Sequence, residues 1–141
     1  MRALLDVDVL IALLDRQHEA HSRVHQWLGE NRSTGWASCP LTERGCLRIM
    51  TDSRYPARVS AVEVLGRLFT AKHVGNYEFW PDDLSMTDAL IFDRGSFRHQ
   101  EATEVYLLAL ATKRGGRLLT FNKSIPVTIA MMARSENLVV L

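Results

Sequence analysis

The chain has 141 residues, of which 47% are hydrophobic and 23% charged, a composition ordinary for one globular domain with a sizeable core. Its 17 basic and 16 acidic residues leave a formal net charge of +1. This balance excludes a generic basic coat for nucleic acid, so any contact with RNA or DNA must be local. No apolar run approaches the roughly 18 residues of a membrane span, and the two cysteines do not have the number or spacing of a zinc site. We therefore expect a single domain over residues 1–141, without a membrane segment, in the cytoplasm.

Taken in order, the chain predicts strands separated by helices. The short apolar segment RALLD predicts a buried strand, and from Val7 the apolar residues follow the i, i+3, i+4, i+7 spacing of one helical face. Pro40 suits the first turn of a helix, and Gly115 with Gly116 suits the end of one. Residues 82–100 predict only a short helix and a loop. The other expected elements are a helix over 21–31, a strand over 35–39, helices over 40–51 and 55–69, a strand over 77–80, a helix over 101–114, and strands over 117–121 and 137–141.

This alternation indicates an α/β fold in three layers, α/β/α. The sheet is expected to have four to five mostly parallel strands, with helices on both faces. In such sheets the functional groups gather at the carboxyl edge, where a strand ends and the next helix begins. The candidate functional residues are therefore the polar side chains at these junctions.

Two aspartates interrupt the apolar segment LLDVDVLIALL near the start of the chain. Asp6 falls at the end of the first predicted strand, and Asp8 falls in the first turn of the helix after it. One aspartate is explained by a helix cap with a favourable dipole contact, worth about 1 kcal/mol. With a second aspartate present, a capping role and a functional role are about equally well supported.

Two glutamates and an asparagine stand at comparable positions. Glu43 shares a helical face with Cys46 and Met50, so its carboxylate points inward, where it needs a cation or hydrogen-bond donors. Glu104 opens the most apolar helix of the chain, and Asn122 directly follows a strand, as Asp6 does. Each of the three also has an ordinary explanation as a helix or turn cap.

Together these residues predict a metal site. Clustered carboxylates repel one another and do not all stay ionised without a counter-cation. Oxygen-rich sites favour Mg²⁺ or Mn²⁺. Such a site suits phosphodiester hydrolysis, because the metal activates water and neutralises the charge that develops on the phosphate.

The same segments carry a resemblance to a known family. LLDVDVLIALL is similar to the opening D-x-N-V-L-I-A-L of PIN-domain ribonucleases of the VapC type, the toxins of bacterial toxin–antitoxin pairs. WASCPLTERGCLRIM resembles the W-A-[ST]-C-P-[IL]-T-E-x-G-x-x-R segment of that family. EATEVYLLALATKRGGRLLTFNKSI resembles V-T-D-A-Y-L-L-A-L-A followed by G-G-x-L-x-T-F-D. The resemblance covers nearly the whole chain, and the combination of the three segments is specific.

The resemblance implies a PIN domain with Mg²⁺-dependent endoribonuclease activity, Mn²⁺ being the alternative metal. It also implies a cognate VapB-like antitoxin, an RNA substrate and a homodimer. Carried over position by position, the catalytic residues are Asp6, Glu43, Glu104 and Asn122. The metal ligands are Asp6, Glu43 and Glu104, with Asp8 beside them.

Three positions depart from the family pattern. Asp8 replaces an asparagine, Glu104 replaces an aspartate and is one methylene longer, and Asn122 replaces an aspartate. An amide oxygen can still bind Mg²⁺ but adds no charge and cannot act as a base. We therefore predict that Asp8 partly compensates for Asn122.

Two alternatives remain open from the sequence. A PIN domain weakened by Asn122 would act mainly in binding RNA or the antitoxin. The segment ALLDVDVL also resembles the first motif of haloacid-dehalogenase phosphatases, with Asp6 as nucleophile and Asp8 as acid–base. In that alternative Ser38, Lys72 and the pair Asp82-Asp83 would supply the later motifs.

Two further groups of residues give weaker signals. The histidines His18, His21 and His25 lie on one helical face without zinc-motif spacing, and we expect them to be solvated or packed on their ring edges. Several basic residues are expected near the cleft, where they could contact RNA phosphates, although surface solvation is the ordinary role of each. They are Arg44, Arg48, Arg114, Arg117 and Lys123.

Overall fold

The computed structural model describes all 141 residues, and its centre is a five-stranded sheet in which every neighbouring pair is parallel. The strand order is β3-β2-β1-β4-β5, so the first strand is central. The predicted parallel sheet of four to five strands is confirmed. The strands are β1 (Ala3–Leu5), β2 (Trp36–Ser38), β3 (Tyr77–Phe79), β4 (Arg117–Thr120) and β5 (Leu138–Val140).

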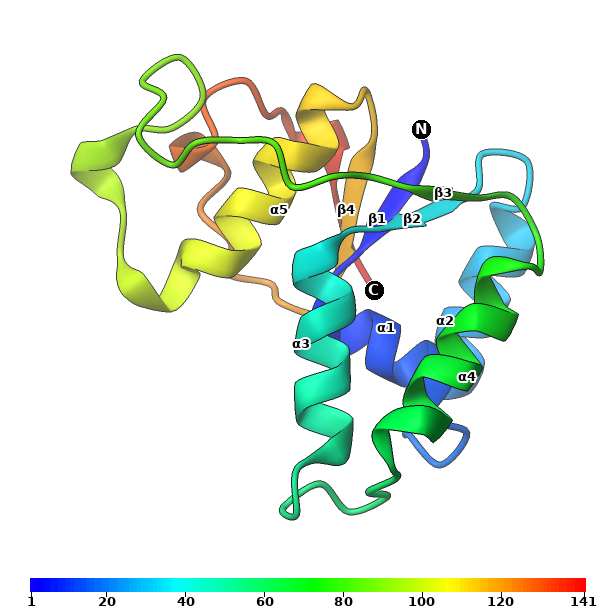
Figure 1. Ribbon diagram of the computed structural model, residues 1–141. Coiled ribbons are helices and arrows are strands. Elements are labelled where there is room, and N and C mark those ends of the chain that lie inside the picture. The colour runs from blue at the N-terminus through cyan, green and yellow to red at the C-terminus, as the bar shows by residue number, and fades with distance from the viewer.

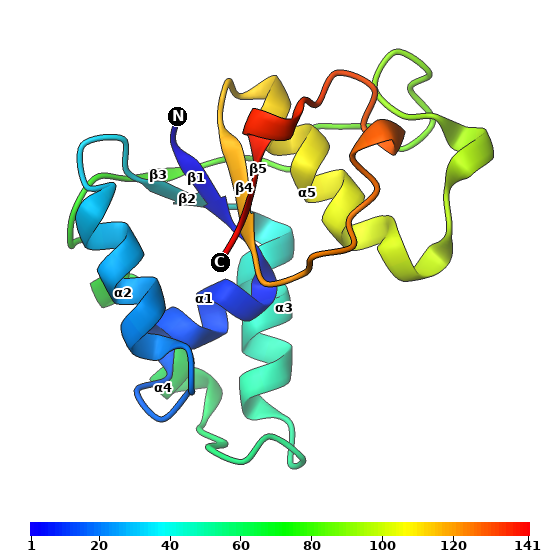
Figure 2. The ribbon, with the colours of Figure 1, turned by 180° about the vertical axis from the view of Figure 1, so that it is seen from behind.

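Five α-helices surround the sheet. They are α1 (Val7–Leu14), α2 (His21–Glu30), α3 (Pro40–Thr51), α4 (Ala61–Lys72) and α5 (Ala102–Lys113). Figures 1 and 2 show α5 on one side of the sheet and α1, α2 and α4 on the other. The predicted α/β/α layering is therefore confirmed.

The start of α4 differs from the prediction, which placed it at residue 55. The helix begins after Ser60, whose hydroxyl accepts a hydrogen bond from the backbone N–H of Glu63, and this cap sets the boundary. The preceding segment forms turns instead, and the hydroxyl of Tyr55 donates a hydrogen bond to the carboxylate of Asp15.

The two faces of the sheet have separate apolar cores because successive strand residues point to opposite sides. Ala3 and Leu5 pack with α1 to α4, whereas Leu4 between them packs against α5. Every residue of α5 from Val105 to Ala111 is buried, as its continuous apolar sequence predicts. Gly116 then allows α5 to return to the sheet, because a Cβ there would lie 2.6 Å from the carbonyl oxygen of Arg2.

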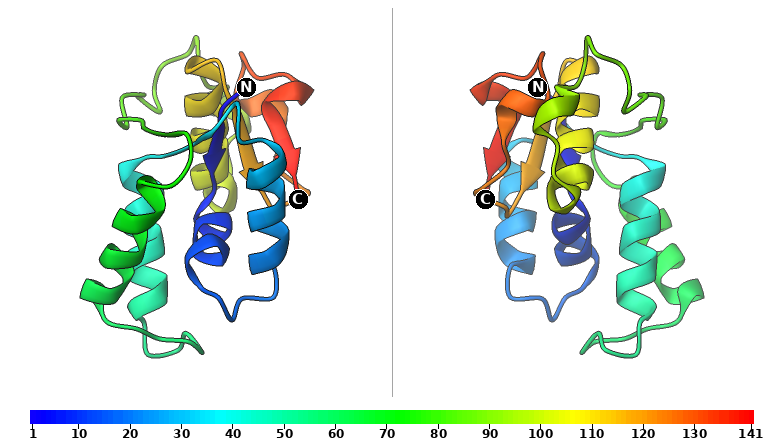
Figure 3. Two further views of the ribbon diagram at one scale, coloured as in Figure 1. Left: turned by 90° about the vertical axis from the view of Figure 1, so that its right-hand side faces the viewer. Right: turned by 90° about the vertical axis from the view of Figure 1, so that its left-hand side faces the viewer.

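The segment between β3 and α5 contains turns and two short 3₁₀ helices, at Arg94–Ser96 and His99–Glu101. It lies on the α5 side of the molecule (Figures 1 and 3), where buried Phe92 anchors it through a bridge to Ala130. No helix in the structure combines the length and the apolar character needed to cross a membrane.

Candidate metal centre

The carboxyl edge of the sheet brings Asp6 between two elements. β1 ends at Leu5, and Asp6 is the N-cap of α1, where its Oδ1 accepts a hydrogen bond of 2.8 Å from the N–H of Val7. Its Oδ2 accepts a second hydrogen bond of 2.6 Å from the hydroxyl of Thr120, the last residue of β4. The capping role expected of one aspartate is present, and it uses only one of the two carboxylate oxygens.

Asp6 is buried with neutral donors and other acids around it. Only 8% of the residue is exposed, and this burial raises the pKa of its carboxyl group. The hydrogen bonds from Thr120 and Val7 act in the opposite direction, while the negative charges of Glu104 and Asp8 raise the pKa of Asp6 further. No salt bridge within the chain supplies Asp6 with a cation.

Glu104, in the first turn of α5, has a buried oxygen without a partner. Its Oε2 accepts no hydrogen bond, and among buried side-chain atoms only Nε of Arg117 shares this condition. Buried polar atoms are normally satisfied, so such an oxygen near a second carboxylate is available to a cation. Asp8 is exposed in the first turn of α1 and adds a third acid at this place.

Glu43 has partners of its own within the chain. Its Oε1 forms an ion pair with Nζ of Lys72 and accepts a hydrogen bond of 2.6 Å from the hydroxyl of Ser38. The hydroxyl of Tyr77 lies 3.5 Å from the same oxygen and 2.9 Å from the hydroxyl of Ser38. The sequence predicts that this inward glutamate needs a cation or donors, and the chain provides both.

Asn122 is exposed and forms a turn after β4. Its side-chain oxygen accepts a hydrogen bond of 2.9 Å from the N–H of Ser124, and its own N–H donates to the hydroxyl of Thr120. This is the turn-capping role that the sequence also allows at this position. The amide oxygen is therefore already engaged by the backbone.

The predicted residues are thus divided between two places. The negative charges of Glu104 and Asp8 act on Asp6, whereas Glu43 belongs to the cluster around Lys72. No three side chains of His, Cys, Asp or Glu are grouped so that they could hold a metal ion. The donors at Asp6 and Glu104 nevertheless fit a divalent cation, because they are carboxylate oxygens, one is unpartnered, and neither has a counter-ion.

Sequence reasoning missed Thr120 as a partner of Asp6 and missed Lys72 as a partner of Glu43. Thr120 has a weak sequence signal, since it is the last residue of a buried strand and stands two positions before Asn122. Lys72 has no local signal, because it ends an amphipathic helix as many lysines do.

Two of the basic residues expected near the cleft lie at the opposite edge of the sheet. Arg117 begins β4 opposite Ala3, donates to the side chain of Asn31 and places its guanidinium 4.8 Å from the ring centroid of Trp27. Arg114 follows α5 and forms a salt bridge with Asp83. The prediction is wrong for these two, because the end of α5 and the start of β4 both lie at the amino edge.

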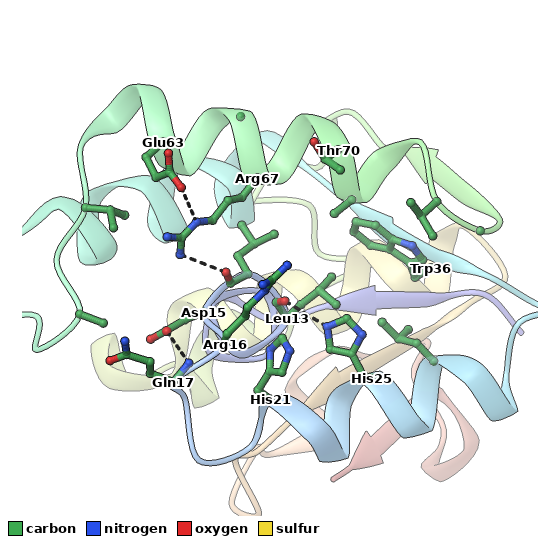
Figure 4. A pocket seen from close by; sticks show the side chains of 18 of the residues that line it. Leu13, Asp15, Arg16, Gln17, His21, His25, Trp36, Glu63, Arg67 and Thr70 are labelled. Atoms are coloured by element: carbon green, nitrogen blue, oxygen red, sulfur yellow. Dashed lines mark hydrogen bonds and ion pairs between the residues drawn. The ribbon is translucent and has the colours of Figure 1, made fainter.

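A pocket with a volume of about 1380 Å³ lies between α2 and α4 beside the end of α1, and none of the predicted acids lines it (Figure 4). Ring nitrogens of His21 and His25 lie 2.8 and 3.3 Å from the carbonyl oxygens of Ala12 and Leu13. These two histidines therefore hydrogen-bond the end of α1, a role that the sequence did not predict. The pocket is separate from the carboxyl edge.

No family model matches the chain. The similar proteins and the similar solved structure described next nevertheless agree on one family. Ribonuclease VapC44 of Mycobacterium tuberculosis is 40% identical over 142 residues, covering 100% of both chains. Ribonuclease VapC38 of the same species is 36% identical over 124 residues, covering 87% of this chain and 86% of VapC38. Among solved structures, VapBC2 from Rickettsia felis, bound to a DNA fragment from its promoter, matches with a TM-score of 0.58, covering 89% of this chain and 94% of that one at 12% identity, which shows the fold.

Proposed function

Because the chain belongs to the family of VapC ribonucleases, we propose that it is a metal-dependent endoribonuclease that acts in the cytoplasm as the toxin of a toxin–antitoxin pair. The observation that carries the metal dependence is the buried Asp6 beside an unpartnered oxygen of Glu104, two acids without a cation. Mg²⁺ is the proposed ion and Mn²⁺ its substitute, because both prefer carboxylate oxygens.

In this proposal Asp6 and Glu104 hold the metal ion. Thr120 and the N–H of Val7 fix the orientation of the Asp6 carboxylate, so its geometry does not depend on the ion. When bound, a divalent cation lowers the pKa of a water molecule and neutralises charge on the scissile phosphate. The burial of Asp6 keeps bulk water from this carboxylate and thereby strengthens its attraction for a cation.

The other predicted site residues have secondary roles in the proposal. Asp8 is exposed at the start of α1 and adds the negative charge that Asn122 lacks. Glu43 is neutralised by Lys72, and the side chain of Asn122 is engaged in a turn. The exposed side chains of Arg44, Arg48 and Lys123 are left to contact RNA phosphates.

The proposed partners follow from the family. The structural neighbour from Rickettsia felis is named as VapB and VapC together, which supports a VapB-like antitoxin as the partner of this chain. A basic antitoxin segment would complement the acids at the carboxyl edge. We also propose a homodimer and a single PIN domain over residues 1–141.

Two other functions compete with this proposal. A PIN domain that binds RNA without efficient cleavage is favoured by the neutral side chain at Asn122. The phosphatase alternative is disfavoured. It requires Ser38 and Lys72 to act at Asp6, but both side chains bind Glu43.

The proposal is tested by RNA cleavage with and without Mg²⁺, in the wild type and in Asp6→Asn. The matched control is Asp52→Asn, which changes a partly exposed aspartate at the far end of α3, where it pairs with Arg54. We expect metal-dependent cleavage that is lost in Asp6→Asn and kept in Asp52→Asn. RNA binding without cleavage would instead establish the binding module, and phosphate release from a phosphomonoester would establish the phosphatase.

A further inference from the structure

Lys72 is held against Glu43 by three elements of the fold. Lys72 ends α4, Glu43 lies in the first turn of α3, and both side chains are about three-quarters buried, with 24% and 22% exposure. Nζ of Lys72 lies 5.4 Å from the ring centroid of Tyr77 and 5.5 Å from that of Phe79, both on β3. Such a cation is constrained by aromatic faces as well as by its carboxylate.

This ion pair differs from the surface pairs of the same chain. In the pair of Arg54 with Asp52 the arginine side chain is 90% exposed, so water competes for both charges. The pair of Lys72 with Glu43 is largely shielded, and the hydroxyl of Ser38 donates to the same Glu43 oxygen. The carboxylate of Glu43 is therefore electrostatically satisfied without any bound ion.

Glu43 is nonetheless close to the proposed metal ligands along the sheet edge. Ser38 ends β2, the strand that pairs with β1, and Asp6 directly follows β1. Gly45, two residues after Glu43, lies so close to α1 that a Cβ there would be 2.9 Å from a side-chain carbon of Val7. The second turn of α3 thus lies against Val7, the residue next to Asp6.

We propose that Lys72 competes with the metal ion for Glu43 and acts as a positioning residue that keeps this glutamate out of the ligand set. The inference rests on the proposed metal site at Asp6 and Glu104, and it goes beyond it by assigning α4 a role in metal affinity. With Lys72 in place, the site offers the ion two acids, the buried Asp6 and the partly buried Glu104. Without Lys72, Glu43 is free to turn toward them as a third.

The test is the affinity of the purified full-length chain for Mn²⁺, measured by calorimetry and by electron paramagnetic resonance of the free ion. The variants are Lys72→Met, which keeps the length of the stem, Glu43→Gln, and the double variant. Lys72→Arg is the control, because it keeps the positive charge. We expect Lys72→Met to bind Mn²⁺ about tenfold more tightly, since an added carboxylate ligand raises the affinity of such sites.

The double variant separates ligation from general charge. Removing a positive charge attracts any cation, so a gain that persists in the Glu43→Gln background would overturn the proposal. We expect the gain to disappear there, and Glu43→Gln alone to change the wild-type affinity less than about twofold. Lys72→Gln, with thermal unfolding as the folding control, replaces Lys72→Met if that variant does not fold.

Two results contradict the inference and one contradicts its premise. If folded Lys72→Met binds Mn²⁺ with the affinity of the wild type, Lys72 does not compete with the ion. If Glu43→Gln loses as much Mn²⁺ affinity as Asp6→Asn does, Glu43 is already a ligand in the wild type. Unchanged Mn²⁺ affinity in Asp6→Asn would instead remove the proposed metal site, whatever Lys72 does.

Discussion

Asp6 and Glu43 are two carboxylates at neighbouring strand ends with opposite surroundings. Asp6 has a hydroxyl and an amide as donors, two further acids nearby and no cation. Glu43 has a lysine, a serine hydroxyl and a tyrosine hydroxyl around a single oxygen. One carboxylate is therefore left electrostatically unsatisfied by the fold, and the other is satisfied by it.

The difference separates the proposed metal site from a structural contact. A buried acid without a cation costs stability, and such a cost is retained where a ligand provides the missing charge. A carboxylate that already has its lysine gains little from an external ion. The proposed metal centre is therefore identified by the carboxylate of Asp6, which lacks a cation, and not by the number of acids in the sequence.

The largest expected effect is on Asp6 itself. Asp6→Asn keeps the size and the acceptor for the Val7 N–H but removes the charge. RNA cleavage should fall by more than about 100-fold, since losing an outer-sphere partner alone commonly costs 10- to 100-fold. Initial rates at saturating Mg²⁺ measure this, and Asp52→Asn should keep the wild-type rate. Equal cleavage rates in the wild type, Asp6→Asn and Asp52→Asn would contradict a catalytic role for Asp6 and remove the distinction between Asp6 and Glu43.

The next effect is on Thr120, which orients Asp6 without carrying charge. Thr120→Val keeps the shape and removes the 2.6 Å hydrogen bond. We expect Mn²⁺ affinity to fall about tenfold and the free energy of unfolding to fall by about 1 kcal/mol. Thr120→Ser retains the hydroxyl and should bind Mn²⁺ as the wild type does. A Thr120→Val variant with unchanged affinity would show that the hydrogen bond serves only the fold.

A pH effect should distinguish the two carboxylates in the metal-free protein. Burial raises the pKa of Asp6, so the folded state holds its proton more tightly than the unfolded chain, whose carboxyl pKa is about 3.9. The stability contribution of Asp6 is therefore present at low pH and is lost as pH rises through its folded pKa. Asp6→Asn should be more stable than the wild type at pH 7, measured as the free energy of unfolding, and this gain should shrink near pH 4. A variant less stable than the wild type at pH 7 would contradict the raised pKa.

The smallest effects concern Asp8 and Asn122. Both are exposed, so solvent screens their charges, and each substitution should change Mn²⁺ affinity by only about two- to threefold. Asn122→Asp should strengthen binding, and Asp8→Asn should weaken it if Asp8 compensates for the missing acid. Titration at low and at high ionic strength checks this, because a charge effect decreases with salt. If Asp8→Asn does not change the Mn²⁺ affinity, Asp8 serves only to stabilise the N-terminus of α1.

The contrast also explains which features the sequence could predict. The junction at Asp6 and the burial of α5 were predictable, because strand burial and helical period are encoded by adjacent residues. The start of α4 was missed, since the apolar spacing reaches back before Ser60 although the N-cap at Ser60 begins the helix only there. The partners of the two acids were beyond sequence reasoning: Thr120 and Asp6 stand 114 positions apart, and only the parallel pairing of β1 with β4 brings them together.

The most direct measurement is the anomalous difference map of a crystal of this protein soaked in Mn²⁺. We expect one peak within ligand distance, about 2 to 2.5 Å, of carboxylate oxygens of Asp6 and Glu104, with Glu43 still paired to Lys72. A peak bound to Glu43, with Lys72 displaced and Asp6 without an ion, would contradict it.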